Sequence, residues 1–63
     1  MKENVGKRIL VQMNPGTPGN YMEWKVLEVA GEMVKVRKQN NVEAWFETKE
    51  FDGTKYKVIE VLK

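Results

Sequence analysis

A chain of 63 residues is long enough for one domain and no more, and this one contains no Cys, no His and no Ser. These absences exclude disulfide bridges, the usual zinc-ligand sets and the common hydrolase triads, so packing and hydrogen bonding have to stabilise the fold. Eleven Lys and Arg against nine Asp and Glu give a formal net charge of +2 and a pI near 9.0, a balance that neither requires nor excludes a nucleic-acid partner.

Gly and Pro residues divide the chain into short runs in which apolar and polar residues alternate, a pattern typical of β-strands. In the first run Ile9, Val11 and Met13 share one face. The loop of residues 14–20 follows, and its two Pro-Gly pairs suit type II turns. The sequence predicts five strands, near residues 7–13, 21–29, 33–38, 42–48 and 55–62.

Two of the runs change parity along their length. In the second, the apolar residues lie on one face up to Val26 and on the other from Leu27 onward, which predicts a β-bulge or a sharp coil at that point. The fifth run changes in the same way between Val58 and Ile59. A helix is the competing interpretation of the second run, but its early end at Gly31 and its Val and Trp content favour a strand.

Tight turns predict the register of the central strands. Gly31-Glu32 suits a two-residue type II′ loop, and Gln39-Asn40-Asn41 suits a three-residue loop with Asn in the left-handed conformation. The first loop places Val29 opposite Val34, Glu28 opposite Lys35, and Leu27 opposite Val36. The second places Arg37 opposite Glu43, Val36 opposite Ala44, Lys35 opposite Trp45, and Val34 opposite Phe46. The two loops predict the same orientation of the side chains. The residues expected to face inward are Val34, Val36, Ala44 and Phe46, and those expected to face outward are Lys35, Arg37, Glu43 and Trp45.

Residues 49–53 form a compact segment, which we expect to be one turn of helix closed by Gly53 with Phe51 as its apolar plug. Over residues 7–62 this arrangement of strands and turns resembles the Src-homology-type or Tudor-like small barrel. The resemblance implies an all-β fold, a small five-stranded partly open barrel with a short helical turn before the last strand, formed by residues 1–63 as a single domain. The five-stranded oligonucleotide-binding barrel is the alternative, although it usually needs more chain.

Little catalytic chemistry remains in the composition. Glu47 and Glu50 are close enough in sequence to act as paired carboxylates, but nothing indicates a pocket that would raise the pKa of either one. We therefore expect a protein that is not an enzyme, with no catalytic residue, no cofactor and no metal site. No apolar stretch has the length of a membrane span and no signal peptide is visible, so we expect a cytoplasmic protein without a membrane partner.

Exposed aromatic residues beside cations are the most informative functional feature. Trp45 is predicted on the outer face next to Lys35, where its ring could stack on a base or a peptide side chain, or could instead be covered by Lys stems. Tyr21 and Trp24 flank the long loop. Each of them either binds a ligand or fills the core, and the core is the favoured place for Trp24. Basic residues that could gather on one side, or could form salt pairs with interleaved glutamates, are Lys25, Lys35, Arg37, Lys38, Lys55 and Lys57.

Two functions fit these features. The first is a nucleic-acid-binding small barrel that uses exposed aromatic rings and Lys or Arg. The second is a protein-interaction or homo-oligomeric assembly module that binds a peptide or pairs through a strand edge. The candidate binding residues for nucleic acid or a partner are Trp45, Tyr21, Trp24, Lys35, Arg37 and Lys25.

Overall fold

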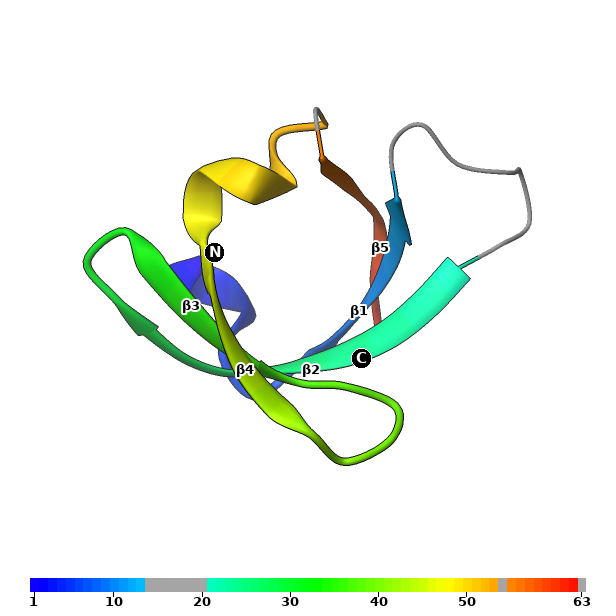
Figure 1. Cartoon of the computed structure of the whole chain (residues 1–63), viewed down its shortest axis with the longest axis horizontal. Helices are drawn as coiled ribbons and strands as arrows, with labels where there is room; N and C mark the ends of the chain where they lie inside the picture. The colour runs from blue at the N-terminus through cyan, green and yellow to red at the C-terminus, as the bar shows by residue number, and fades with distance from the viewer. Residues whose placement is uncertain (14–20, 54, 63) are drawn as a thin grey trace.

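The computed structural model describes residues 1–13, 21–53 and 55–62, and it forms one five-stranded antiparallel sheet (Figure 1). The strands follow the order β4-β3-β2-β1-β5, and the curved sheet does not close into a barrel. The predicted type II turns of the long loop lie outside the described residues. The elements are η1 (Lys2–Asn4), β1 (Arg8–Met13), β2 (Tyr21–Ala30), β3 (Met33–Arg37), β4 (Glu43–Glu47), η2 (Thr48–Phe51) and β5 (Tyr56–Leu62).

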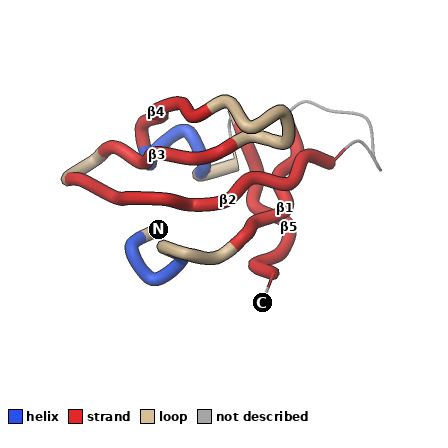
Figure 2. Tube along the Cα trace, turned by 90° about the horizontal axis from the view of Figure 1, so that it is seen from below, coloured by secondary structure: helices blue, strands red, loops and turns tan. Residues whose placement is uncertain are grey.

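β2 is the longest strand and pairs with a neighbour on each side of the sheet (Figure 2). Its first half pairs with β1, and its second half pairs with β3. Lys25 is the β2 residue that takes part in both registers, opposite Arg8 on one side and Arg37 on the other. The three central strands are therefore in register with one another at Lys25.

The turn chemistry predicted most of the register correctly. All four predicted β3–β4 pairs, from Arg37 with Glu43 to Val34 with Phe46, are confirmed. Asn41 has a φ of 66°, as expected for the left-handed residue of the three-residue loop. Gly31 has a φ of 60°, whereas Glu32 is not in the positive-φ region, as a type II′ turn requires.

One predicted pair is wrong, because the bulge displaces it. Val26, and not Leu27, lies opposite Val36, and the register shifts between Val26 and Glu28. The bulge itself was predicted at this point, but the register beyond it was counted without the extra residue. In β5 the predicted parity change is also confirmed: the pairing with β1 shifts by one residue and leaves Ile59 as the extra residue.

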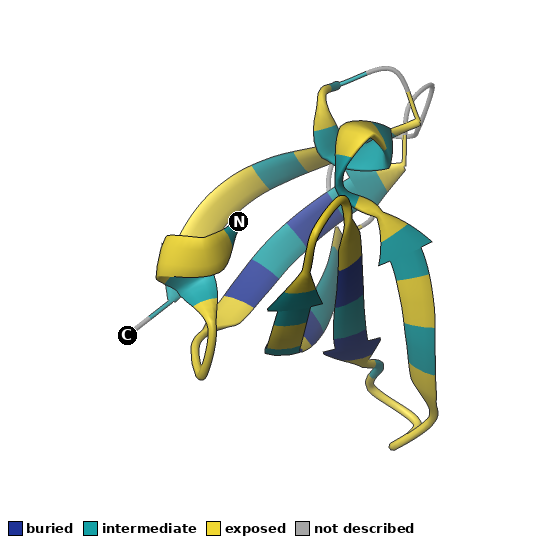
Figure 3. Ribbon diagram, turned by 90° about the vertical axis from the view of Figure 1, so that its left-hand side faces the viewer, coloured by how far each residue is buried: buried dark blue, intermediate teal, exposed yellow. Residues whose placement is uncertain are grey.

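The core lies on the concave face of the central strands. Figure 3 shows that the buried residues lie in β1, β2 and β3, while β4 and β5 carry only intermediate and exposed ones. Met13, expected on the inner face with Ile9 and Val11, is 52% exposed because it lies at the end of its strand. The buried core residues are Ile9, Val11, Trp24, Val26, Val34 and Val36.

Four aromatic rings extend this core across the opening of the sheet. Trp24 stacks on Phe46 of β4 with ring centroids 5.2 Å apart, and Phe51 of η2 stacks on Tyr56 of β5 at 5.4 Å. Trp24 also makes edge contacts with Phe51 and Tyr56. Phe51 is thus the apolar plug that the sequence predicts, and η2 connects the two edge strands that do not pair (Figure 1).

A pair of substitutions at Asn41 tests the β3–β4 turn. Asn41→Ala is expected to lower the free energy of unfolding by about 1 kcal/mol, because a Cβ-bearing residue without a local hydrogen-bonding side chain is strained at positive φ. Asn41→Gly is expected to change it by less than about 0.5 kcal/mol. Urea denaturation measures both values. Equal destabilisation by Ala and Gly would contradict the left-handed assignment.

Candidate nucleic-acid interface

A row of three cations crosses the convex face of the sheet. Arg8, Lys25 and Arg37 occupy directly opposed positions on β1, β2 and β3. Each lies next to a buried residue whose side chain points the other way, so all three side chains are on the outer face and exposed. Adjacent strands are about 4.8 Å apart, so the row spans about 10 Å. We call these three residues the cation row.

The cation row carries an electrostatic cost within the fold. Like charges placed directly opposite each other on neighbouring strands destabilise a sheet. The two ends are compensated, because Arg8 pairs with Glu23 at 3.1 Å and Arg37 pairs with Glu43 at 3.0 Å. Lys25, between the two arginines, makes no ion pair with any residue that the structure describes. Its charge is therefore the one least neutralised within the row.

Glu43 binds two cations at once. Its carboxylate accepts a hydrogen bond from Arg37 and lies 3.1 Å from the Lys35 ammonium. The hydrogen bond from Arg37, followed by that from Lys35, holds the pKa of the Glu43 carboxyl below its usual 4.5. Exposed pairs of this kind contribute little to stability.

Of the six basic residues that could gather on one side, Lys25, Lys35 and Arg37 lie together, and two of these three also pair with Glu43. Lys38 lies over the Trp24 and Phe46 rings, Lys55 pairs with Glu50, and Lys57 is on β5.

Trp45 extends the same face beyond the cation row. This residue is 46% exposed, as predicted, and the Lys35 ammonium lies 6.0 Å from the centroid of its ring. Lys35 is directly opposite Trp45, and Arg37 is two residues further along β3. The predicted residues Lys25, Lys35, Arg37 and Trp45 therefore lie on one continuous outer surface.

The other two predicted aromatic residues are elsewhere. Tyr21 is exposed on the outer face but lies six residue positions along the strands from Trp45, a separation of about 20 Å. Trp24 is on the inner face and only 4% exposed, so it belongs to the core. A single stacking platform built from all three rings is therefore not formed.

Sequence reasoning missed Arg8. Its parity relative to Ile9 and Val11 places it on the outer face, but its position opposite Lys25 depends on the β1–β2 register. The two central turns have loop lengths that determine their registers, whereas the connection through residues 14–20 is too long for such a rule. The alternation of Arg8 with the buried residues was the available signal.

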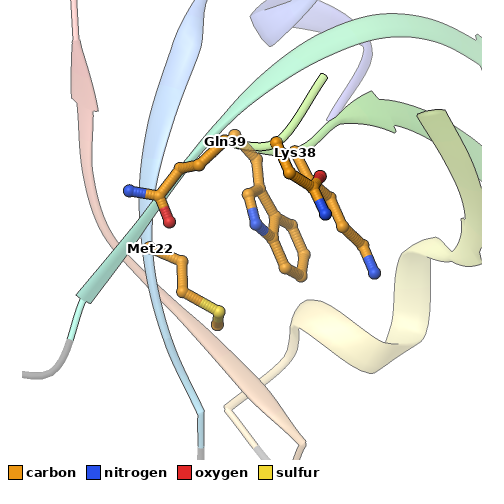
Figure 4. A pocket seen from close by; sticks show the side chains of 5 residues that line it. Met22, Lys38 and Gln39 are labelled. Atoms are coloured by element: carbon orange, nitrogen blue, oxygen red, sulfur yellow. The ribbon is translucent and has the colours of Figure 1, made fainter. Parts of the chain in front are cut away.

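A second feature lies beside the β3–β4 turn. A pocket of about 250 Å³ is bordered by Met22 and Trp24 of β2 and by three residues of the turn, Lys38, Gln39 and Asn40. Figure 4 shows the Gln39 side chain near that of Met22, and the Lys38 side chain on the other side of the view. The Lys38 ammonium lies 5.8 Å from the Trp24 ring centroid and 5.4 Å from that of Phe46. Of these residues the sequence singled out only Trp24 and, as one of several cations, Lys38.

The carboxylates considered for acid–base chemistry have a structural role. Glu47 and Glu50 form a capping box around η2, in which the Glu47 backbone N–H donates to the Glu50 carboxylate at 2.8 Å. That hydrogen bond and the ion pair with Lys55 hold the pKa of the Glu50 carboxyl below its usual value. Within residues 1–13, 21–53 and 55–62, no cluster of three or more acidic residues is arranged to hold a metal ion.

The two helical segments of the described ranges, η1 and η2, are each a short 3-10 turn. Neither has the length or the apolar character needed to cross a membrane.

The chain matches no protein-family model, and comparisons with curated proteins and with solved structures gave no significant match.

The two-cation contact of Glu43 predicts a titration shift. Arg37→Gln is expected to raise the pKa of the Glu43 carboxyl toward 4.5, while Lys57→Gln, a distant exposed lysine on β5, should leave it unchanged. Because the folded pKa is depressed, the contribution of Glu43 to stability is present above its unfolded pKa and is lost as the pH falls through the folded value. Carboxyl carbon NMR measures the titration. An unshifted Glu43 in the wild type would contradict the contact.

Proposed function

We propose that this protein is a non-enzymatic nucleic-acid-binding module, and that its outer sheet face binds the phosphate backbone of a single strand. The observation that carries the proposal is the cation row. Three cations stand directly opposite one another at a cost to the sheet, and the central one, Lys25, has no ion-pair partner in the described part of the chain. An external polyanion would relieve that repulsion.

The surface beside the cation row favours a single-stranded ligand over a duplex. Trp45 is half exposed next to Lys35, and an exposed aromatic ring next to a cation can stack on an unpaired base. The bases of a duplex are stacked on one another and offer no face to such a ring. The proposed roles are phosphate contacts for Lys25, Arg37, Arg8 and Lys35, and base stacking for Trp45.

The fold is consistent with this use. We also propose that the open sheet is a partly open barrel of the Src-homology or Tudor-like type, because its strands follow the order β5-β1-β2-β3-β4 with a 3-10 turn before the last strand. That likeness alone assigns no ligand, since one small barrel architecture serves many functions.

A protein partner is the second candidate, and the β4 edge favours it. β4 is five residues long, has no neighbour on its outer side within the described sheet, and carries the exposed Trp45. A peptide or a second copy could add a strand there. Size-exclusion chromatography with light scattering tests the second copy: a monomer at all concentrations would exclude it.

The nucleic-acid proposal predicts a salt-dependent interaction that Lys25 strengthens. A short single-stranded oligonucleotide is expected to bind at low salt, and Lys25→Gln is expected to weaken binding about fivefold whatever the base sequence. The slope of log K against log salt concentration should also become about 0.7 less steep, since one phosphate contact is lost. Fluorescence anisotropy measures both quantities.

Lys57→Gln is the matched control, because it removes the same charge from an exposed lysine of β5. Lys57 lies opposite Gln12, four residues and about 13 Å along β1 from Arg8. Its loss should have a clearly smaller effect than the loss of Lys25. Equal effects of the two variants would show general charge attraction without a defined row, and binding that is absent at low salt would refute the proposal.

A further inference from the structure

The pocket beside the β3–β4 turn has a polar donor that nothing in the described fold uses. Trp24 is 4% exposed, and none of the side-chain hydrogen bonds between the described residues involves its indole N–H. A buried Trp normally finds a hydrogen-bond partner for this group. No buried side-chain polar atom of the described residues is sealed from solvent without a partner, so the indole nitrogen reaches open space. Trp24 is one of the residues that border the pocket, so the pocket is where an external acceptor could meet this group.

The other side chains around the pocket combine an apolar wall with amide groups. Met22 contributes the apolar side, and Gln39 and Asn40 each bring a carboxamide from the turn (Figure 4). The Asn40 carbonyl oxygen accepts a hydrogen bond from the Val42 N–H at 3.2 Å, so its NH₂ group remains available as a donor. An occupant would therefore meet an indole donor, the amide donor of Asn40, and the carboxamide of Gln39, which can both donate and accept a hydrogen bond.

The size of the pocket limits the occupant. About 250 Å³ is below the range of sites that enclose a drug-sized ligand, so it fits one planar ring system or the end of a larger molecule. The aromatic faces are not free for an external cation, because the Lys38 ammonium already lies over Trp24 and Phe46. A planar group with acceptors on its edge is the chemistry that fits.

The pocket is also close to the cation row. Lys38 and Gln39 directly follow Arg37, the end of the row on β3, so the pocket entrance is one or two residues from a proposed phosphate contact. A strand that runs from the row around the β3–β4 turn would bring a base to this entrance. A nucleobase carries ring and carbonyl acceptors on its edge and comes attached to a phosphate.

We infer that the pocket beside the β3–β4 turn holds one nucleobase of a bound strand, with the Trp24 indole N–H donating to an acceptor on the base and Gln39 contacting its edge. This inference rests on the proposed function, and it adds a site on the opposite face of β2 from the cation row. The base inserts over the turn while its phosphate stays near Arg37 and Lys38.

The test uses the full chain carrying Trp45→Ala, which removes the exposed ring and leaves Trp24 as the only indole. An oligonucleotide is compared with an abasic sugar-phosphate strand of the same length. We expect the oligonucleotide to bind about tenfold more tightly. We also expect it to shift the Trp24 indole N–H resonance in an NMR spectrum of ¹⁵N-labelled protein, whereas the abasic strand should leave that resonance in place.

A second variant separates the pocket from the backbone contacts. Gln39→Ala, in the same background, is expected to remove most of the tenfold preference and to leave the affinity for the abasic strand unchanged. Asn4→Ala is the matched control, since it truncates an amide in η1 on a residue that does not border the pocket. It should preserve both affinities.

The outcomes distinguish this inference from the proposed function. Equal affinity for the two strands overturns the base pocket and leaves the cation row standing. If neither strand binds to this variant or to the wild-type chain, the proposed function fails. A titration with a nucleoside monophosphate then decides the pocket: a shifted Trp24 indole resonance supports it, and an unshifted one overturns it. A shift caused by an uncharged peptide and not by nucleotides also overturns it, in favour of a protein partner.

Discussion

The aromatic contact across the open side of the sheet is the interaction on which the remaining structure depends. β4 and β5 do not pair, so backbone hydrogen bonds cannot fix the distance between the two ends of the sheet. The stacked pair of Trp24 and Phe46 and the stacked pair of Phe51 and Tyr56 contact each other edge to face across that opening. In a chain without Cys or His, these rings supply much of the apolar area that a core of mostly Val and Ile side chains lacks.

The same contact links the core to the candidate sites. Trp24 packs in the core against Phe46 and also borders the pocket, so one residue has two positions that a sequence pattern cannot separate. Its neighbour Lys25 points the other way, into the cation row. Because successive side chains of a strand alternate, β2 supplies both faces from adjacent positions, and anchoring Trp24 also fixes where Lys25 emerges.

The sequence predicts the parts of this protein that depend on local chemistry. Gly31 and Asn41 occupy positions with a positive φ, which few residues adopt, and this identifies the two turns. The length of each loop then determines which residues pair, so the sequence predicts the β3–β4 register and the exposure of Trp45. The position of Arg8 opposite Lys25 depends on a long connection, for which no turn rule exists. The pocket was missed because Gln39 and Asn40 are ordinary turn residues by sequence, and only the packing of the turn against β2 brings them beside Trp24.

The bulge at Leu27 has a consequence for the shape of the outer face. It lies between the position of Lys25, in the cation row, and that of Glu28, which faces Lys35 and continues to Trp45. A bulge bends its strand and increases the local twist, so the two parts of the face are inclined to each other. A molecule that touches both must follow a curved path. A flexible chain adapts to that curvature at little cost, whereas a duplex with a persistence length of about 50 nm resists it, so under the proposed function the extra residue would favour a single strand over a duplex.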